Sequence, residues 1–110
     1  QVGGQVFVAP DEPDRRIASA SLEIQAGPAI AYAGLEFAPD SGANHCGGIY
    51  ELVSYWPNTC EDVATKAFAT FKRMSPLRES IIALDGGTSV RVFLMSAGTG
   101  CVSIKKEITF

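Results

Sequence analysis

His45 and Cys46 form the one place in the chain where a base and a nucleophile stand next to each other. A thiolate enzyme needs a third group that orients the base, and its cysteine and histidine normally come from distant parts of the chain. Adjacent residues of an extended segment also point to opposite faces. We therefore interpret Cys46 as a structural cysteine beside a loop histidine, and we predict no catalytic residue and no enzymatic activity.

The other reactive residue types do not form a recognisable site either. Acidic residues are spread along the chain without a pair that would face each other across a cleft, as a glycosidase requires. The glycine runs at 86–87 and 98–100 join extended segments, whereas a phosphate loop leads from a strand into a helix and carries a lysine. A single histidine and three cysteines without a CxxC pair do not indicate zinc. We predict no metal and no cofactor.

Cys46, Cys60 and Cys101 predict one disulfide and one leftover thiol in an oxidising compartment. Their spacing leaves all three pairings open, and an unpaired cysteine can link two copies into a homodimer. The chain starts at Gln1 without a methionine, as a processed secreted protein does. We therefore predict a secreted, extracellular protein. Three reduced thiols in a cytosolic protein are the alternative.

Length and composition indicate one globular domain over residues 1–110. Hydrophobic residues make up 46% of the chain and charged residues 19%, which is typical of a chain with a packed core. The longest apolar segment is interrupted by glycine and proline, so no membrane span is predicted. The net charge of −3 disfavours binding to nucleic acid, because phosphate repels an acidic surface.

Residues 59–74 predict one amphipathic helix. Thr59 is a good N-cap, acidic residues follow it, and basic residues occupy the last turn, which suits the helix dipole. Pro76 ends the helix. The apolar residues recur at spacings of three and four and are predicted to face the core: Ala64, Ala67, Phe68, Phe71 and Met74.

Apolar and alternating segments around this helix predict about seven short strands. Gly34 lies inside one of them and predicts a bulge or the close approach of another backbone. The fold class is α+β, mainly antiparallel β with a Greek-key-like order and one helix packed on the sheet. The strands are predicted at 5–9, 17–25, 29–38, 49–56, 80–84, 89–95 and 101–110.

Three aromatic residues precede the helix, Tyr50, Tyr55 and Trp56. Because large aromatic side chains are chiefly buried, we expect them to pack the helix against the sheet. Any exposed part of this cluster, together with His45, is a candidate interaction surface, since aromatic residues dominate binding hot spots.

Two segments that flank the helix resemble the paired Greek-key motifs of βγ-crystallin domains. In residues 35–52, Phe37 takes the aromatic position and Cys46 the position after the loop, with Gly48 two residues later. In residues 90–106, the same two positions fall on Phe93 and Cys101.

The strand before the second motif resembles the family's serine-containing strand, with Ser80 as that serine. Arg78 and Ile81 depart from the family's calcium-binding signature, and no calcium ligand is predicted. The resemblance implies a Greek-key β fold, and small relatives with this fold include killer toxins, proteinase inhibitors and fungal secreted proteins. The chain also resembles the α/β-sandwich killer toxins and fungal effectors, in which helices cover one face of an antiparallel sheet.

These observations predict a small secreted protein of microbial, fungal type, a toxin or virulence effector that binds a protein or cell-surface target without catalysis. The alternative is a secreted proteinase inhibitor that presents the loop Pro39–Gly48, braced by Cys46. An enzyme of another kind is a third hypothesis, because fold alone does not fix function.

Overall fold

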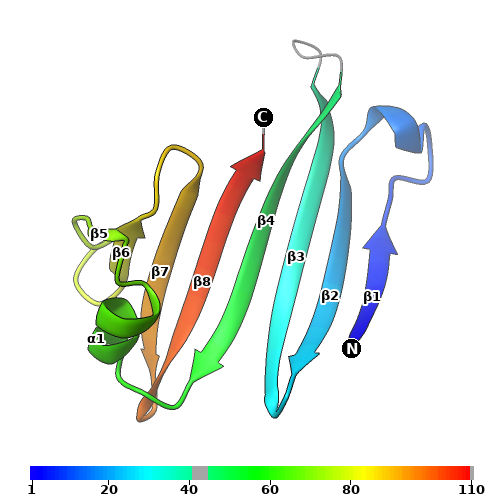
Figure 1. Ribbon diagram of the computed structural model, residues 1–110. Coiled ribbons are helices and arrows are strands. Elements are labelled where there is room, and N and C mark those ends of the chain that lie inside the picture. Colours follow the sequence, from blue (N-terminus) through cyan, green and yellow to red (C-terminus); the bar gives the residue numbers. More distant parts are fainter. Residues whose placement is uncertain (41–44, 110) are drawn as a thin grey trace.

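The computed structural model describes residues 1–40 and 45–109. Its eight strands form one antiparallel sheet in the order β1-β2-β3-β4-β8-β7-β6-β5 (Figure 1). The strands are β1 (Val2–Phe7), β2 (Ala18–Ala26), β3 (Ala29–Asp40), β4 (His45–Trp56), β5 (Lys72–Arg73), β6 (Ile82–Asp85), β7 (Val90–Ala97) and β8 (Gly100–Thr109).

The predicted class, mainly antiparallel β with one helix, is confirmed. There are eight strands rather than about seven, because Lys72 and Arg73 pair with β6 as the short strand β5. Two hairpins are closed by two-residue loops. The first residue of each loop is a glycine with positive φ, Gly27 at 61° and Gly98 at 59°. This is the glycine position of a type II′ turn, whose twist matches that of the flanking strands. The Greek-key description stays a prediction.

The helix is shorter than predicted. It consists of α1 (Cys60–Asp62) and a π-helical turn, η2 (Val63–Ala67). The N-cap prediction is confirmed, since the backbone N–H of Asp62 donates to Oγ1 of Thr59 at 3.2 Å. The prediction that the helix continues to residue 74 is wrong. The chain leaves helical geometry at Phe68 and extends to the edge of the sheet, where Lys72 and Arg73 pair with β6 as β5.

The core lies between this helix and strands β6 to β8. Seven buried residues form it, and Trp56, Phe68, Phe71 and Ile82 pack against it. Of the predicted apolar stripe, Ala64 is buried and Phe68 and Phe71 are half-buried, while Ala67 and Met74 are exposed. The two phenylalanine rings meet edge to face, with centroids 5.4 Å apart. The buried set consists of Cys60, Val63, Ala64, Leu84, Val92, Leu94 and Cys101.

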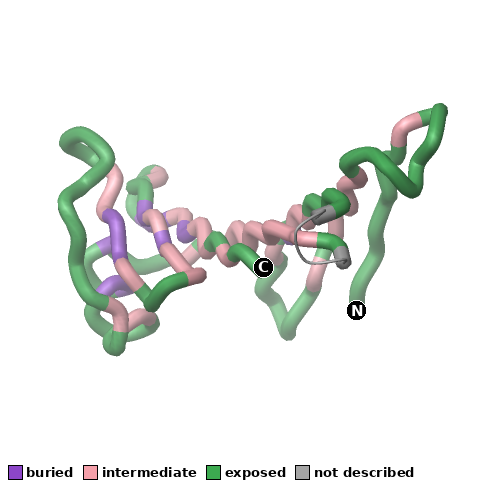
Figure 2. Tube along the Cα trace, turned by 90° about the horizontal axis from the view of Figure 1, so that it is seen from above, coloured by how far each residue is buried: buried purple, intermediate pink, exposed green. Residues whose placement is uncertain are grey.

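Within the described residues, no second layer buries the other half of the sheet, strands β1 to β4. Among its described residues only Ala33 is buried, and Figure 2 shows the buried residues gathered at the opposite end of the sheet. The radius of gyration is 15.9 Å, whereas a compact domain of this length has one of about 13 Å. The protein is therefore two-layered beside the helix and a single layer elsewhere. We call β1 to β4 the open half.

The strand register assigns each residue of the open half to one of two faces, because directly opposed residues point to the same side. One face continues the helix-covered core and carries no charged residue; we call it the apolar face. The opposite face mixes apolar and charged side chains, and we call it the mixed face. The larger side chains of the apolar face are Val2, Val6, Leu22, Ile24, Leu35, Phe37, Tyr50 and Leu52. The mixed face includes Glu23, Ile30, Tyr32, Glu36, Glu51 and Tyr55.

Candidate functional site

The free edge of β1 is the first component of the candidate site. Gln1 and Gln25 exchange backbone hydrogen bonds of 3.0 and 3.3 Å. Hydrogen-bonded and non-hydrogen-bonded pairs alternate along an antiparallel ladder. The unbroken register from Val2 to Phe7 therefore turns the N–H and C=O groups of Val2, Gly4 and Val6 away from β2. These groups form a row of donors and acceptors along the edge of the sheet.

The two edges of the sheet differ in how well they are protected against pairing with another chain. At one edge, β5 has only two residues and both are cationic, and short charged edge strands discourage pairing with another chain. At the other edge, β1 has six residues, VGGQVF, without charge or proline, and all six are exposed. The β1 edge is thus the one that can accept a further strand.

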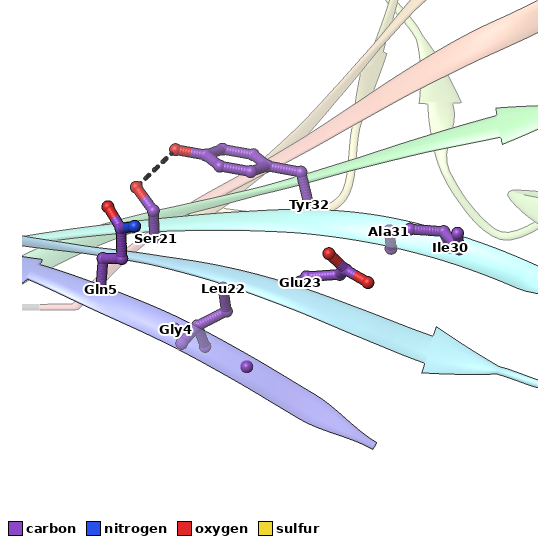
Figure 3. A pocket seen from close by; sticks show the side chains of 9 residues that line it. Gly4, Gln5, Ser21, Leu22, Glu23, Ile30, Ala31 and Tyr32 are labelled. Carbon is purple, nitrogen blue, oxygen red and sulfur yellow. Dashed lines mark hydrogen bonds between the residues drawn. The ribbon is translucent and has the colours of Figure 1, made fainter.

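A hollow of about 460 Å³ lies beside this edge on β1, β2 and β3. Figure 3 shows Tyr32 lying over the sheet with its hydroxyl on Ser21, and the two oxygens are 2.9 Å apart. The ring of Tyr32 can lie flat because Gly34 is beneath it: a Cβ on Gly34 would come within 3.3 Å of the ring. The bulge or backbone approach expected at Gly34 is therefore wrong. The register runs through it unbroken, and the close neighbour is a side chain.

The hollow joins apolar and acidic groups. Ile30 and Tyr32 are 59% and 48% exposed and offer apolar area, while Gln5 and Glu23 offer polar atoms. No described cation forms an ion pair with Glu23, in contrast to Glu51, which lies 3.9 Å from Lys106 across β4 and β8. The hollow can therefore hold an apolar side chain and a basic group at the same time.

The aromatic residues predicted as an interaction surface fall on different faces. Tyr55 lies on the mixed face and is 54% exposed. Trp56 packs edge to face on Phe68, with centroids 6.3 Å apart, and belongs to the core margin. Tyr50 is half-buried on the apolar face and donates to Glu107. The side chain of His45 lies outside the described part of the structure.

The cysteines form the intramolecular disulfide Cys60–Cys101, which ties the start of the helix to β8. This confirms the prediction of a disulfide and selects one of the three pairings left open by the sequence. Cys46 is free and exposed, so no disulfide braces the loop at 39–48. A homodimer linked through Cys46 stays a prediction.

Two hydrogen-bonded pairs shift the pKa values of their groups. The hydrogen bond to Glu107, together with burial and the charge of Glu107, raises the pKa of Tyr50 above its ordinary 10.0. Arg73 donates to both carboxylate oxygens of Glu61 at 3.0 and 2.9 Å. This pairing lowers the pKa of the exposed Glu61 carboxyl and raises the pKa of Arg73.

Over residues 1–40 and 45–109, no three His, Cys, Asp or Glu side chains come together in a way that could hold a metal ion. Within the same ranges, no helix is long and apolar enough to cross a bilayer.

Sequence reasoning did not find the hollow or the free edge. Val2–Phe7 has alternating valines and no charge, which is the pattern of a strand, but which strand lies at the edge follows only from the sheet order. The pairing of Tyr32 with Ser21 requires the register of β2 on β3. No protein-family model matches this chain. No curated protein and no solved structure is significantly similar to this chain either.

Proposed function

We propose that the protein is a secreted, non-catalytic binding module of the toxin or effector type that takes up an extended segment of a partner protein along β1. The observation that supports this proposal is a free, uncharged strand edge next to a hollow on the same strands. Addition of a strand to a sheet edge is a common form of peptide recognition, in which main-chain hydrogen bonds provide affinity and pockets for alternate side chains provide specificity.

The geometry defines the partner segment. Its backbone would pair with the outward groups of Val2, Gly4 and Val6. Every second side chain would then point to the mixed face, where a long apolar side chain would extend over Gly3 toward the ring of Tyr32. A lysine or arginine in the segment would reach the carboxylate of Glu23. The preferred segment is extended and apolar with one basic residue.

The Cys60–Cys101 disulfide supports the secreted part of the proposal, because disulfides persist in oxidising compartments and are rare in the cytosol. The target would then be an extracellular protein or a protein at a cell surface.

Selection of peptides from a displayed random library against the whole chain tests the proposal. We expect the selected peptides to alternate apolar residues and to carry a basic residue. Val6→Pro removes an outward N–H and should weaken binding about tenfold or more, which corresponds to about 1.4 kcal/mol. Val6→Ala keeps the N–H and is the matched control. Failure to select any peptide, or equal binding to both variants, would contradict strand addition at β1.

The role of the hollow is tested with two tyrosines on the same face. Tyr32 lines the hollow and Tyr55 lies outside it, and their exposed fractions are similar, 48% and 54%. Tyr32→Ala should weaken peptide binding by about 1 to 2 kcal/mol, as loss of an aromatic contact at an interface does. Tyr55→Ala should leave binding unchanged. If Tyr55→Ala weakened peptide binding more than Tyr32→Ala, the peptide would contact another part of the mixed face.

A proteinase inhibitor is the second candidate, and the hairpin of β3 and β4 supports it. The hairpin continues to Asp40 and His45. Its neighbours stop earlier: β2 begins opposite Phe37, and β8 ends opposite Gly48. The hairpin therefore projects beyond the rest of the sheet (Figure 1). A panel of serine, cysteine and aspartic proteinases tests this function, which is excluded for those classes if none of them is slowed at micromolar protein.

A further inference from the structure

The apolar face of the open half is a second surface that the proposed strand addition does not use. It continues the core beyond the helix and lies on the opposite side of the sheet from the side chains of Tyr32 and Glu23. Val2, Val6 and Phe37 on it are 65%, 73% and 42% exposed. A sheet with one apolar face is stable when that face is buried against a second layer. Here the helix provides that layer only over β6 to β8.

We propose that a second copy of this chain provides the missing layer, so that two apolar faces pack against each other across a two-fold axis. The result is a β-sandwich over the open halves of both copies, with the two sheets about 10 Å apart. Such an interface is isologous, because the same patch is used by both copies.

The size of the face supports a stable dimer. Its strands have 6, 9, 12 and 12 residues. Four strands about 4.8 Å apart and about 34 Å long cover roughly 650 Å² as a flat area. The accessible area of a side-chain surface exceeds its flat outline, and specific dimers bury about 800 Å² of accessible surface in each partner. The apolar face is therefore of the size that a stable dimer requires.

The charge distribution also favours a second copy. The chain carries a net charge of −3, and two copies would repel each other if their charges met. The apolar face carries no charge, and the first charged residues next to it, Lys105 and Glu107, lie on β8 at its border. Packing through this face thus keeps the acidic groups of both copies in water. An anionic lipid surface, by contrast, would require basic residues around the face.

Sedimentation velocity at micromolar concentration tests the dimer. We expect the whole chain to sediment at twice its 11.6 kDa mass. Leu35→Glu places a charge in the middle of the apolar face and should give a monomer. Ile30→Glu lies on the same strand but on the mixed face and should remain a dimer, and circular dichroism reports whether each variant is folded. If Leu35→Glu does not fold, Phe37→Glu, at a more exposed position of the same face, replaces it.

Three results would overturn the inference. The wild-type chain could sediment as a monomer, or both glutamate variants could remain dimers. The dimer could also be lost in Val6→Pro but not in Leu35→Glu, which would mean that the two copies join through their β1 edges. A failure of the dimer leaves the proposed function intact, since peptide binding is measured separately with Tyr32→Ala and Tyr55→Ala, whose side chains lie on the mixed face.

Discussion

The indole of Trp56 donates a hydrogen bond of 2.8 Å to the hydroxyl of Ser103 on the neighbouring strand β8. Ser103 is only 3% exposed and lies on β8 two residues after Cys101 of the disulfide. The bond therefore satisfies a donor at the boundary between the covered and the open half of the sheet.

Ser103→Ala should lower the free energy of unfolding by about 1 to 2 kcal/mol, because the indole N–H loses its partner in a partly buried place. Urea unfolding followed by Trp56 fluorescence measures this change. Ser96→Ala, at an exposed position of the adjacent strand, should remain within about 0.5 kcal/mol of the wild type. An equal loss in both variants would show that the hydrogen bond contributes nothing specific.

The Cys60–Cys101 disulfide closes a loop with a sequence separation of 41 residues. By the chain-entropy relation, a loop of this length stabilises the fold by about 4 kcal/mol. The double variant Cys60→Ala, Cys101→Ala should therefore unfold at a much lower urea concentration. Cys46→Ser should unfold like the wild type, because Cys46 is free and exposed. Equal midpoints for the wild type and the double variant would contradict this stabilisation.

The pair Tyr50 and Glu107 predicts a loss of stability at alkaline pH. Because the pKa of Tyr50 is raised in the folded state above its ordinary 10.0, its contribution is fully present below pH 10.0. It is lost as the pH rises through the folded-state pKa, where the phenol no longer donates. Tyr50→Phe should cost about 1 kcal/mol at neutral pH, and the difference from the wild type should shrink at high pH. A difference that is independent of pH would mean that packing, not the hydrogen bond, accounts for it.

The pair Glu61 and Arg73 predicts the opposite behaviour at acid pH. The pKa of Glu61 is lowered in the folded state, so its contribution is present above its ordinary 4.5 and is lost as the pH falls through the folded-state pKa. Wild type and Glu61→Gln should therefore differ in melting temperature near neutral pH and converge in acid. Glu79→Gln removes an exposed carboxylate that has no ion pair among the described residues, and it should show no such convergence. Parallel curves for Glu61→Gln and wild type would contradict the ion pair.

The local parts of the fold could be predicted from the sequence because they depend on local patterns. The seven predicted strands all occur, with boundaries shifted by up to four residues. The cap at Thr59 was also predictable, since it needs only a side-chain oxygen ahead of a helical segment. The turns at Gly27 and Gly98 are also predictable, because each glycine lies between two segments with a strand pattern.

The end of the helix could not be predicted in this way. Phe68 and Phe71 fit a helical stripe, but their rings meet the core from a chain that has already left the helix. The contacts that favour this path, such as the bond from the N–H of Met74 to the carbonyl of Ala83, join residues that are not neighbours in sequence.

The open half was missed because alternation reveals an apolar face but not what covers it. Leu22 and Ile24 alternate with polar residues in the manner of a half-buried strand. One short helix covers only the part of the sheet beside β6 to β8. The large number of strands relative to one short helix indicates that part of the sheet lacks a covering layer. This inference requires the knowledge that all strands form a single sheet.

Strand addition at β1 is tested most directly by amide hydrogen exchange of the whole chain, followed by NMR, with and without a selected peptide. Strand addition predicts that the N–H groups of Gly4 and Val6 exchange quickly in the free protein and become protected when the peptide binds. It also predicts little change at Gly3 and Gln5, which already pair with β2. Protection confined to the turns at 86–87 and 98–99, with none along β1, would contradict it.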